Sequence, residues 1–128
     1  DTLHFAPNSS PRARQRIVLA GTGVGAAVAL HAASRLPDRV AGVVTFAGLV
    51  ELAANELRNA RLPVLLLVGA NDRITARRNA EAARSFGGHA TLMRIPRAGH
   101  AFEEPGVLGV AAEHVTGWLA RIDRRGGR

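Results

Sequence analysis

Four short, almost continuously apolar segments alternate with four segments typical of helices, and this alternation constrains the fold more than any other feature. We expect strands at Arg16–Ala20, Val40–Ala47, Pro63–Gly69 and Ala90–Ile95, and helices at Val24–Leu36, Leu49–Ala60, Thr75–Phe86 and Pro105–Ile122. Strands that are apolar along their whole length are typical of parallel sheets covered on both faces. The sequence therefore predicts an α/β fold with three α/β/α layers, in which helices cover both faces of a parallel sheet.

The length and composition allow one domain of this kind. The chain has 128 residues, of which 47% are hydrophobic, and it contains no cysteine, which excludes disulfides and thiol chemistry. Residues 1–15 are polar and contain two prolines, so we expect a loop or linker there, followed by the domain at 16–123 and a basic tail at 124–128. No apolar run is long enough to span a membrane and no signal peptide is visible, so we expect a cytoplasmic protein without a membrane partner.

The charge of the chain is strongly positive. The net charge is +7, and all 17 basic residues are arginines. These arginines are spread along the chain, with clusters only near the two ends, which is typical of solvated surface positions. We therefore expect no nucleic-acid partner.

A glycine-rich turn follows the first expected strand. Residues 21–25 read G-T-G-V-G and lie between the strand and an Ala-rich helix, which is the layout of a nucleophile elbow, G-x-S-x-G. The middle position, where the elbow carries its serine, is Gly23, which has no side chain. Thr22 is one position early and should point away from the site. The elbow is thus predicted without its attacking group.

Two further residues suit an acid–base pair. Asp72 follows the third expected strand and His100 follows the fourth, so both lie at carboxyl ends of parallel strands. The order elbow, acid, histidine is the order of a hydrolase triad on such a sheet. In that arrangement the histidine deprotonates the nucleophile and the carboxylate orients the imidazole. Asp72 alone could equally be the N-cap of the helix that follows it.

These motifs together resemble the C-terminal half of an α/β-hydrolase of the dienelactone-hydrolase type. The matching stretches are G-T-G-V-G-A-A-V-A-L, L-P-D-R-V-A-G-V-V, P-V-L-L-L-V-G-A-N-D and A-G-H-A-F-E-E-P-G, in that order, over about residues 16–122. The last stretch is similar to hydrolase domains found with phosphoribosyltransferase-like domains in actinobacteria.

The resemblance implies an ester or acyl-bond hydrolase that works through an acyl-enzyme, without cofactor or metal. It places the nucleophile at Gly23, the acid and base at Asp72 and His100, and one oxyanion-hole amide at Val24. The family's first half, which supplies the early strands and a second oxyanion amide, has no counterpart in the matched stretches. Because Gly23 cannot attack a carbonyl, we expect this activity to be weak or absent.

Two other classes of function remain open. The chain could be a non-catalytic domain that binds an ester or carboxylate ligand, or a structural domain that forms a homodimer or takes up a partner domain along its open first strand. Residues 21–26 also fit the dinucleotide fingerprint G-x-G-x-x-A. That fingerprint calls for an acidic residue at the end of the next strand, where Val44–Ala47 has none, so dinucleotide binding is the weakest alternative.

Overall fold

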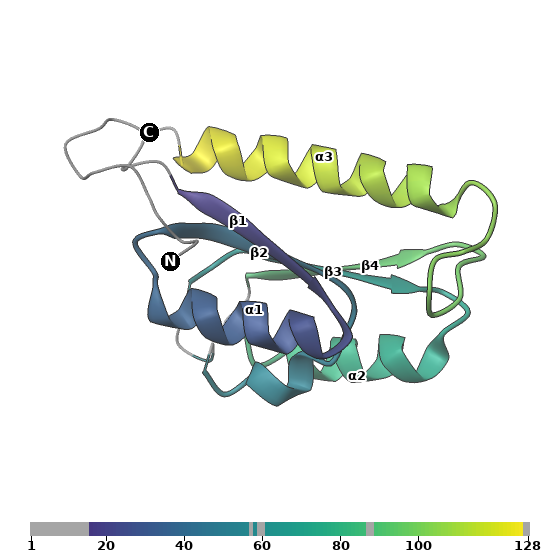
Figure 1. Cartoon of the computed structure of the whole chain (residues 1–128), viewed down its shortest axis with the longest axis horizontal. Coiled ribbons are helices and arrows are strands. Elements are labelled where there is room, and N and C mark those ends of the chain that lie inside the picture. Colours follow the sequence, from purple (N-terminus) through teal and green to yellow (C-terminus); the bar gives the residue numbers. More distant parts are fainter. Residues whose placement is uncertain (1–15, 57, 59–60, 87–88, 127–128) are drawn as a thin grey trace, which may run out of the picture.

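The computed structural model describes residues 16–56, 58, 61–86 and 89–126, in which strands and helices alternate (Figure 1). The elements are β1 (Ile17–Thr22), α1 (Gly23–Arg35), β2 (Val40–Gly48), the 3-10 helix η2 (Val50–Ala53), β3 (Val64–Gly69), α2 (Arg73–Ala83), β4 (Ala90–Ile95) and α3 (Val107–Gly126). The expected linker at 1–15 and the last two residues of the expected tail lie outside the described residues.

The four strands form one parallel sheet in the order β1-β2-β3-β4. Helices α1 and α2 lie on one face of this sheet and α3 lies on the other (Figure 1). The predicted three-layer α/β/α fold is therefore confirmed. The order of the described strands never reverses, and dinucleotides bind α/β sheets at such a reversal, which further weakens that alternative.

The central strand β3 shows why the strands are apolar along their whole length. Every residue from Val64 to Gly69 is buried. Val64 and Leu66 pack into the core beneath α1 and α2, whereas Leu65 and Leu67 pack into the core beneath α3. Since successive side chains point to opposite faces, a strand covered on both sides needs an apolar residue at each position.

The helix expected at Leu49–Ala60 is wrong. Only Val50–Ala53 is helical, as a single 3-10 turn, and residues 57, 59 and 60 lie outside the described residues. Val50 and Ala53 are buried, but Leu52 between them is 61% exposed, so the segment has no apolar face long enough to hold a longer helix. Asn55 then accepts a hydrogen bond from Arg58 Nη2 at 2.9 Å, which is typical of a turn.

The remaining helix and strand limits differ from prediction only at their ends. Helix α2 begins two residues earlier than expected, because Asp72 rather than a later residue caps it. Helix α3 begins two residues later than expected and continues to Gly126, which is into the expected tail. Among the described helices, none is long and apolar enough to cross a membrane.

Strand β1 forms one edge of the described sheet. It pairs with β2 alone within this part of the chain. Its first residue, Ile17, is 46% exposed, and Val24 and Val28 on the adjoining helix α1 are exposed as well. A strand with one unpaired edge, next to exposed apolar side chains, offers a surface on which another strand can pair.

Candidate active site

The turn from β1 into α1 places Gly23 in an unusual backbone conformation. Gly23 is the first residue of α1 and has φ +52°, in the left-handed region. The end of β2 holds this turn, because Leu49 N–H donates to the Gly23 carbonyl oxygen at 3.0 Å and Gly23 forms a bridge with Gly48. A residue with a side chain held here would carry strain of ~1–3 kcal/mol, which glycine avoids. A Cβ built on Gly23 meets no atom within 4 Å, so the space for a side chain is present.

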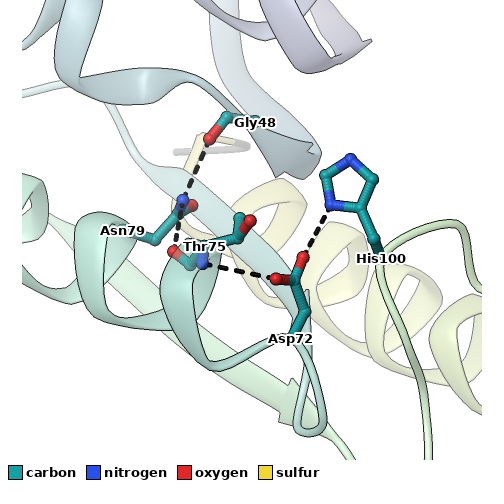
Figure 2. A network of polar contacts seen from close by, with 5 residues as sticks. All are labelled: Gly48, Asp72, Thr75, Asn79 and His100. Atoms are coloured by element: carbon teal, nitrogen blue, oxygen red, sulfur yellow. Dashed lines mark hydrogen bonds and ion pairs between the residues drawn. The ribbon is translucent and has the colours of Figure 1, made fainter.

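Asp72 and His100 are hydrogen-bonded to one another although 28 residues separate them. His100 Nδ1 lies 2.6 Å from Asp72 Oδ2, and Figure 2 shows the second ring nitrogen pointing away from this contact. The other carboxylate oxygen of Asp72 accepts a hydrogen bond from Thr75 N–H at 3.4 Å, at the start of α2. Asp72 therefore caps α2 and contacts His100 at the same time. The sequence left open whether Asp72 is a helix cap or the acid of a pair, and the two roles are compatible.

The environment of Asp72 keeps its carboxylate ionised. Burial raises the pKa of Asp72, but the hydrogen bonds from His100 and Thr75 and the charge of His100 together outweigh it, so the pKa lies below its ordinary value of 3.8. The Asp72 side chain is 15% exposed and that of His100 is 68% exposed. The carboxylate is thus set into the fold while the imidazole faces solvent.

A buried amide connects this pair to the elbow. Asn79 is fully buried in α2, and its Nδ2 donates to the Gly48 carbonyl at 3.0 Å and to the Thr75 carbonyl at 3.1 Å (Figure 2). Thr75 lies in the helical turn that Asp72 caps, and Gly48 bridges to Gly23. Asn79 therefore ties the acid's helix to the backbone of the elbow.

A cavity of about 430 Å³ lies where the elbow and the histidine loop meet. Its walls are formed by Thr22, Gly23, Phe46, Ala47, His100, Ala101, Phe102 and Leu108. Phe46 and Phe102 meet edge to face, with ring centroids 6.2 Å apart. Ala47 at φ 50° and Phe102 at φ 59° are both in the left-handed region, which is rare for residues with side chains and is concentrated at functional sites. The cavity is apolar apart from the histidine and the backbone of the elbow.

The other expected site residues also lie near this cavity. Val24 is the second residue of α1, so its N–H belongs to the first turn, whose amides have no acceptor within the helix. Thr22 also lines the cavity, and the direction of its side chain stays a prediction. Within the described part of the chain, no group of three or more His, Asp or Glu side chains could hold a metal ion.

Sequence reasoning missed Asn79 and the apolar walls of the cavity. Asn79 lies in the middle of a helix, where an asparagine is usually exposed, and its partner Gly48 is 31 residues away. Phe46 and Leu108 belong to segments interpreted as strand and helix core. The one sequence signal of these apolar walls was Phe102, which lies two residues after His100 in a loop.

Comparison with known proteins decides the family. Residues 1–121 match the model of the dienelactone hydrolase family, which is almost the whole chain. The chain belongs to the dienelactone hydrolase family. The structure of a dienelactone hydrolase from Anabaena variabilis is similar to it with a TM-score of 0.78 and 34% identity, over 83% of this chain and 49% of that one.

Two further comparisons show the fold and a related sequence. A predicted CIB-like hydrolase from Thermoplasma acidophilum shares the fold, with a TM-score of 0.66 at 21% identity over 82% of this chain and 51% of that one. Two strains of Mycobacterium tuberculosis have a protein with the provisional name phosphoribosyl transferase that is 36% identical over 99 residues, or 77% of this chain and 22% of its own length. The chain thus spans about half the length of these solved structures and less than a quarter of the mycobacterial proteins.

Proposed function

We propose that this chain carries the acid–base part of an acyl-bond hydrolase site, Asp72 and His100, without a side-chain nucleophile at Gly23. The observation that carries the proposal is the 2.6 Å contact between His100 and Asp72 beside a cavity that Gly23 also lines. On this proposal, hydrolysis through an acyl-enzyme is weak or absent in the chain as it stands.

The hydrogen bond fixes how the imidazole can act. When His100 Nδ1–H donates to Asp72 Oδ2, the proton is held at Nδ1 and Nε2 is left as the base. In a site with a serine, Nε2 would take the hydroxyl proton while the oxygen attacks the carbonyl carbon. Asp72 would then stabilise the imidazolium, for which its depressed pKa suits it.

Stabilisation of the developing oxyanion would be partial. Val24 N–H, in the first turn of α1, is the donor that the family pattern assigns to this role. Loss of one donor from an oxyanion hole lowers kcat by ~10²–10³-fold. A slow reaction is therefore expected even after a nucleophile is restored, if Val24 is the sole donor.

Without a serine, water is the nucleophile that His100 could activate. A water oxygen would bond to the acyl carbon while its proton passes to Nε2, and the alcohol would leave with a proton returned from the imidazolium. No covalent enzyme intermediate forms on this route, so product should appear linearly from the first turnover.

The test is hydrolysis of p-nitrophenyl acetate by the parent, Gly23→Ser, His100→Ala and Gly23→Ser/His100→Ala. We expect Gly23→Ser to show a burst of p-nitrophenol and, by mass spectrometry, an acetyl adduct on the peptide that contains the elbow, and we expect the double variant to lose both. Thr22→Val in the parent is the control, because it removes the neighbouring hydroxyl and should change nothing.

Two results would contradict the proposal. If the parent itself forms an acetyl adduct that Thr22→Val abolishes, then the nucleophile has been misplaced by one residue. If Gly23→Ser folds but forms no adduct, then the pair and the cavity do not make a hydrolase site in this chain.

A second candidate is non-catalytic binding of a carboxylate ligand. The same cavity favours it, because apolar walls formed by Phe46, Phe102 and Leu108 surround the exposed imidazole of His100. A protonated imidazole would pair with the carboxylate while the walls hold an apolar group. Titration with phenylacetate, followed by NMR of the backbone amide signals of the chain, would show saturable shifts that His100→Ala removes.

A further inference from the structure

A second concave site lies on the other side of helix α2, at the β4 edge of the sheet. It is a groove of about 470 Å³ lined by Arg73, Ala76, Arg77, Ala80, Glu81, Arg84 and Arg94. None of these residues lines the cavity beside Gly23 and His100. We call this site the arginine groove.

The periodicities of two elements bring these arginines together. Arg73 and Arg77 in α2 and Arg84 at its C-cap occur at spacings of four and seven residues, which places them on one face of the helix. On β4, Ala90 and Leu92 pack into the core beneath α1 and α2, and Met93 and Ile95 pack beneath α3. Arg94 follows Leu92 by two residues, so it lies on the α2 side of the strand. The arginines of both elements therefore converge.

The arginine groove carries positive charge that the protein itself does not balance. Glu81 is the one carboxylate among its lining residues, against four guanidinium groups. Within the part of the chain that the structure describes, no arginine of the groove forms an ion pair. Converging like charges are unfavourable unless an anion lies between them.

We propose that the arginine groove binds a small oligophosphate, such as a diphosphate or triphosphate group. Guanidinium groups bind phosphate oxygens through paired hydrogen bonds, and several in one groove favour an anion with several charges. The volume is in the range of small-ligand pockets. The small side chains of Ala76 and Ala80 leave the floor open between the arginines. A compact anion can contact guanidinium groups of both elements at once, whereas a polymer would need charge along an extended face.

The experiment is isothermal titration of the chain with inorganic triphosphate at low ionic strength. The test variant is Arg77→Gln/Arg94→Gln, which removes one guanidinium from each wall of the groove. The matched control is Arg35→Gln/Arg78→Gln, which removes the same charge from exposed positions outside it. All of these arginines are exposed, and circular dichroism would verify that each variant folds.

We expect the test variant to weaken binding by at least about tenfold, since each charge-assisted hydrogen bond to the anion is worth roughly that much. The control should weaken it by less than about threefold, through the smaller net charge alone. Triphosphate should also bind more tightly than orthophosphate at equal ionic strength.

Three outcomes would overturn the proposal. Equal losses in the two variants would mean that diffuse charge, not the groove, attracts the anion. Absence of saturable binding by the parent would mean that the groove is a solvated surface. Tighter binding of a single-stranded oligonucleotide than of triphosphate, with the same dependence on Arg77 and Arg94, would assign the groove to nucleic acid instead.

Discussion

On the proposed function, Gly23 is a single residue that separates the fold from its chemistry. Its φ of +52° is one that glycine adopts freely, and the space around it admits a side chain. Replacing a serine by glycine at such a position would remove the nucleophile and relieve backbone strain at once. The pair formed by Asp72 and His100 does not depend on that side chain, which is why its geometry can persist beside it.

Asn79 is a residue whose removal should be felt in stability. Asn79→Ala deletes the donor that satisfies the buried Gly48 carbonyl, and we expect the free energy of unfolding to fall by ~1–3 kcal/mol in urea titrations. Asn71→Ala is the control, because Asn71 is exposed and should change stability by less than ~0.5 kcal/mol. Equal effects of the two substitutions would show that the Gly48 contact contributes nothing.

Asp72 should make the fold sensitive to acid. Its pKa is lowered in the folded chain, so the folded state favours the ionised form and gains stability above the ordinary value of 3.8. That contribution is lost as the pH falls below 3.8, through the lower pKa of the folded state. We expect Asp72→Asn to lower the thermal midpoint at pH 7 and to differ less from the parent at pH 3. Asp38→Asn, at an exposed position, serves as control, and a constant gap for Asp72→Asn across this pH range would contradict the linkage.

At the scale of elements, the end of β3 and the loop that carries His100 are packed without space between them. A Cβ on Gly69 would lie 2.3 Å from the Ala98 carbonyl oxygen and 2.4 Å from that of Gly99. Both contacts are with backbone atoms, which cannot rotate away. The loop is thus positioned by direct contact with the strand that precedes Asp72.

Gly69→Ala should therefore displace the histidine loop and lower the free energy of unfolding by ~3 kcal/mol. The loss should appear as a lower urea midpoint and as a shifted NMR signal of the His100 ring. Gly109→Ala makes the same chemical change in α3, where nothing lies within 4 Å, and should raise stability by ~0.5–1 kcal/mol. An unchanged midpoint for Gly69→Ala would show that the loop can move aside at little cost.

The sequence predicted the elements whose patterns are local. Strand β4 was predicted with its observed limits. The order of strands and helices placed Asp72 and His100 at the carboxyl ends of two strands of the sheet. The segment after β2 was predicted wrongly, because its many Ala, Leu and Glu residues favour a helix whether or not a face is covered. Asn79 and the arginine groove depend on contacts between distant segments, which no local pattern reveals.

At the scale of the whole molecule, the open edge of β1 is the feature that bears on association. We propose that its open edge pairs with a second copy or with a partner domain, and Ile17 at 46% exposure lies on that edge. Sedimentation velocity should show association at ~100 µM, and Ile17→Lys should shift the population to monomer by introducing charge at the edge. Leu52→Lys, at an exposed position on η2, should leave association unchanged. A parent that sediments as a monomer would refute pairing with a second copy.

The strand order has a consequence for how the chain reaches its folded state. Each described strand pairs with the strand that comes next in the sequence, so no ladder has to wait for a distant segment. Closing the connection between such neighbours costs less conformational entropy than joining strands that are remote in the sequence. Assembly can begin at the fully buried β3 and spread outward, one strand and helix at a time. The ladder between β1 and β2 would then be among the last to form and the first to open.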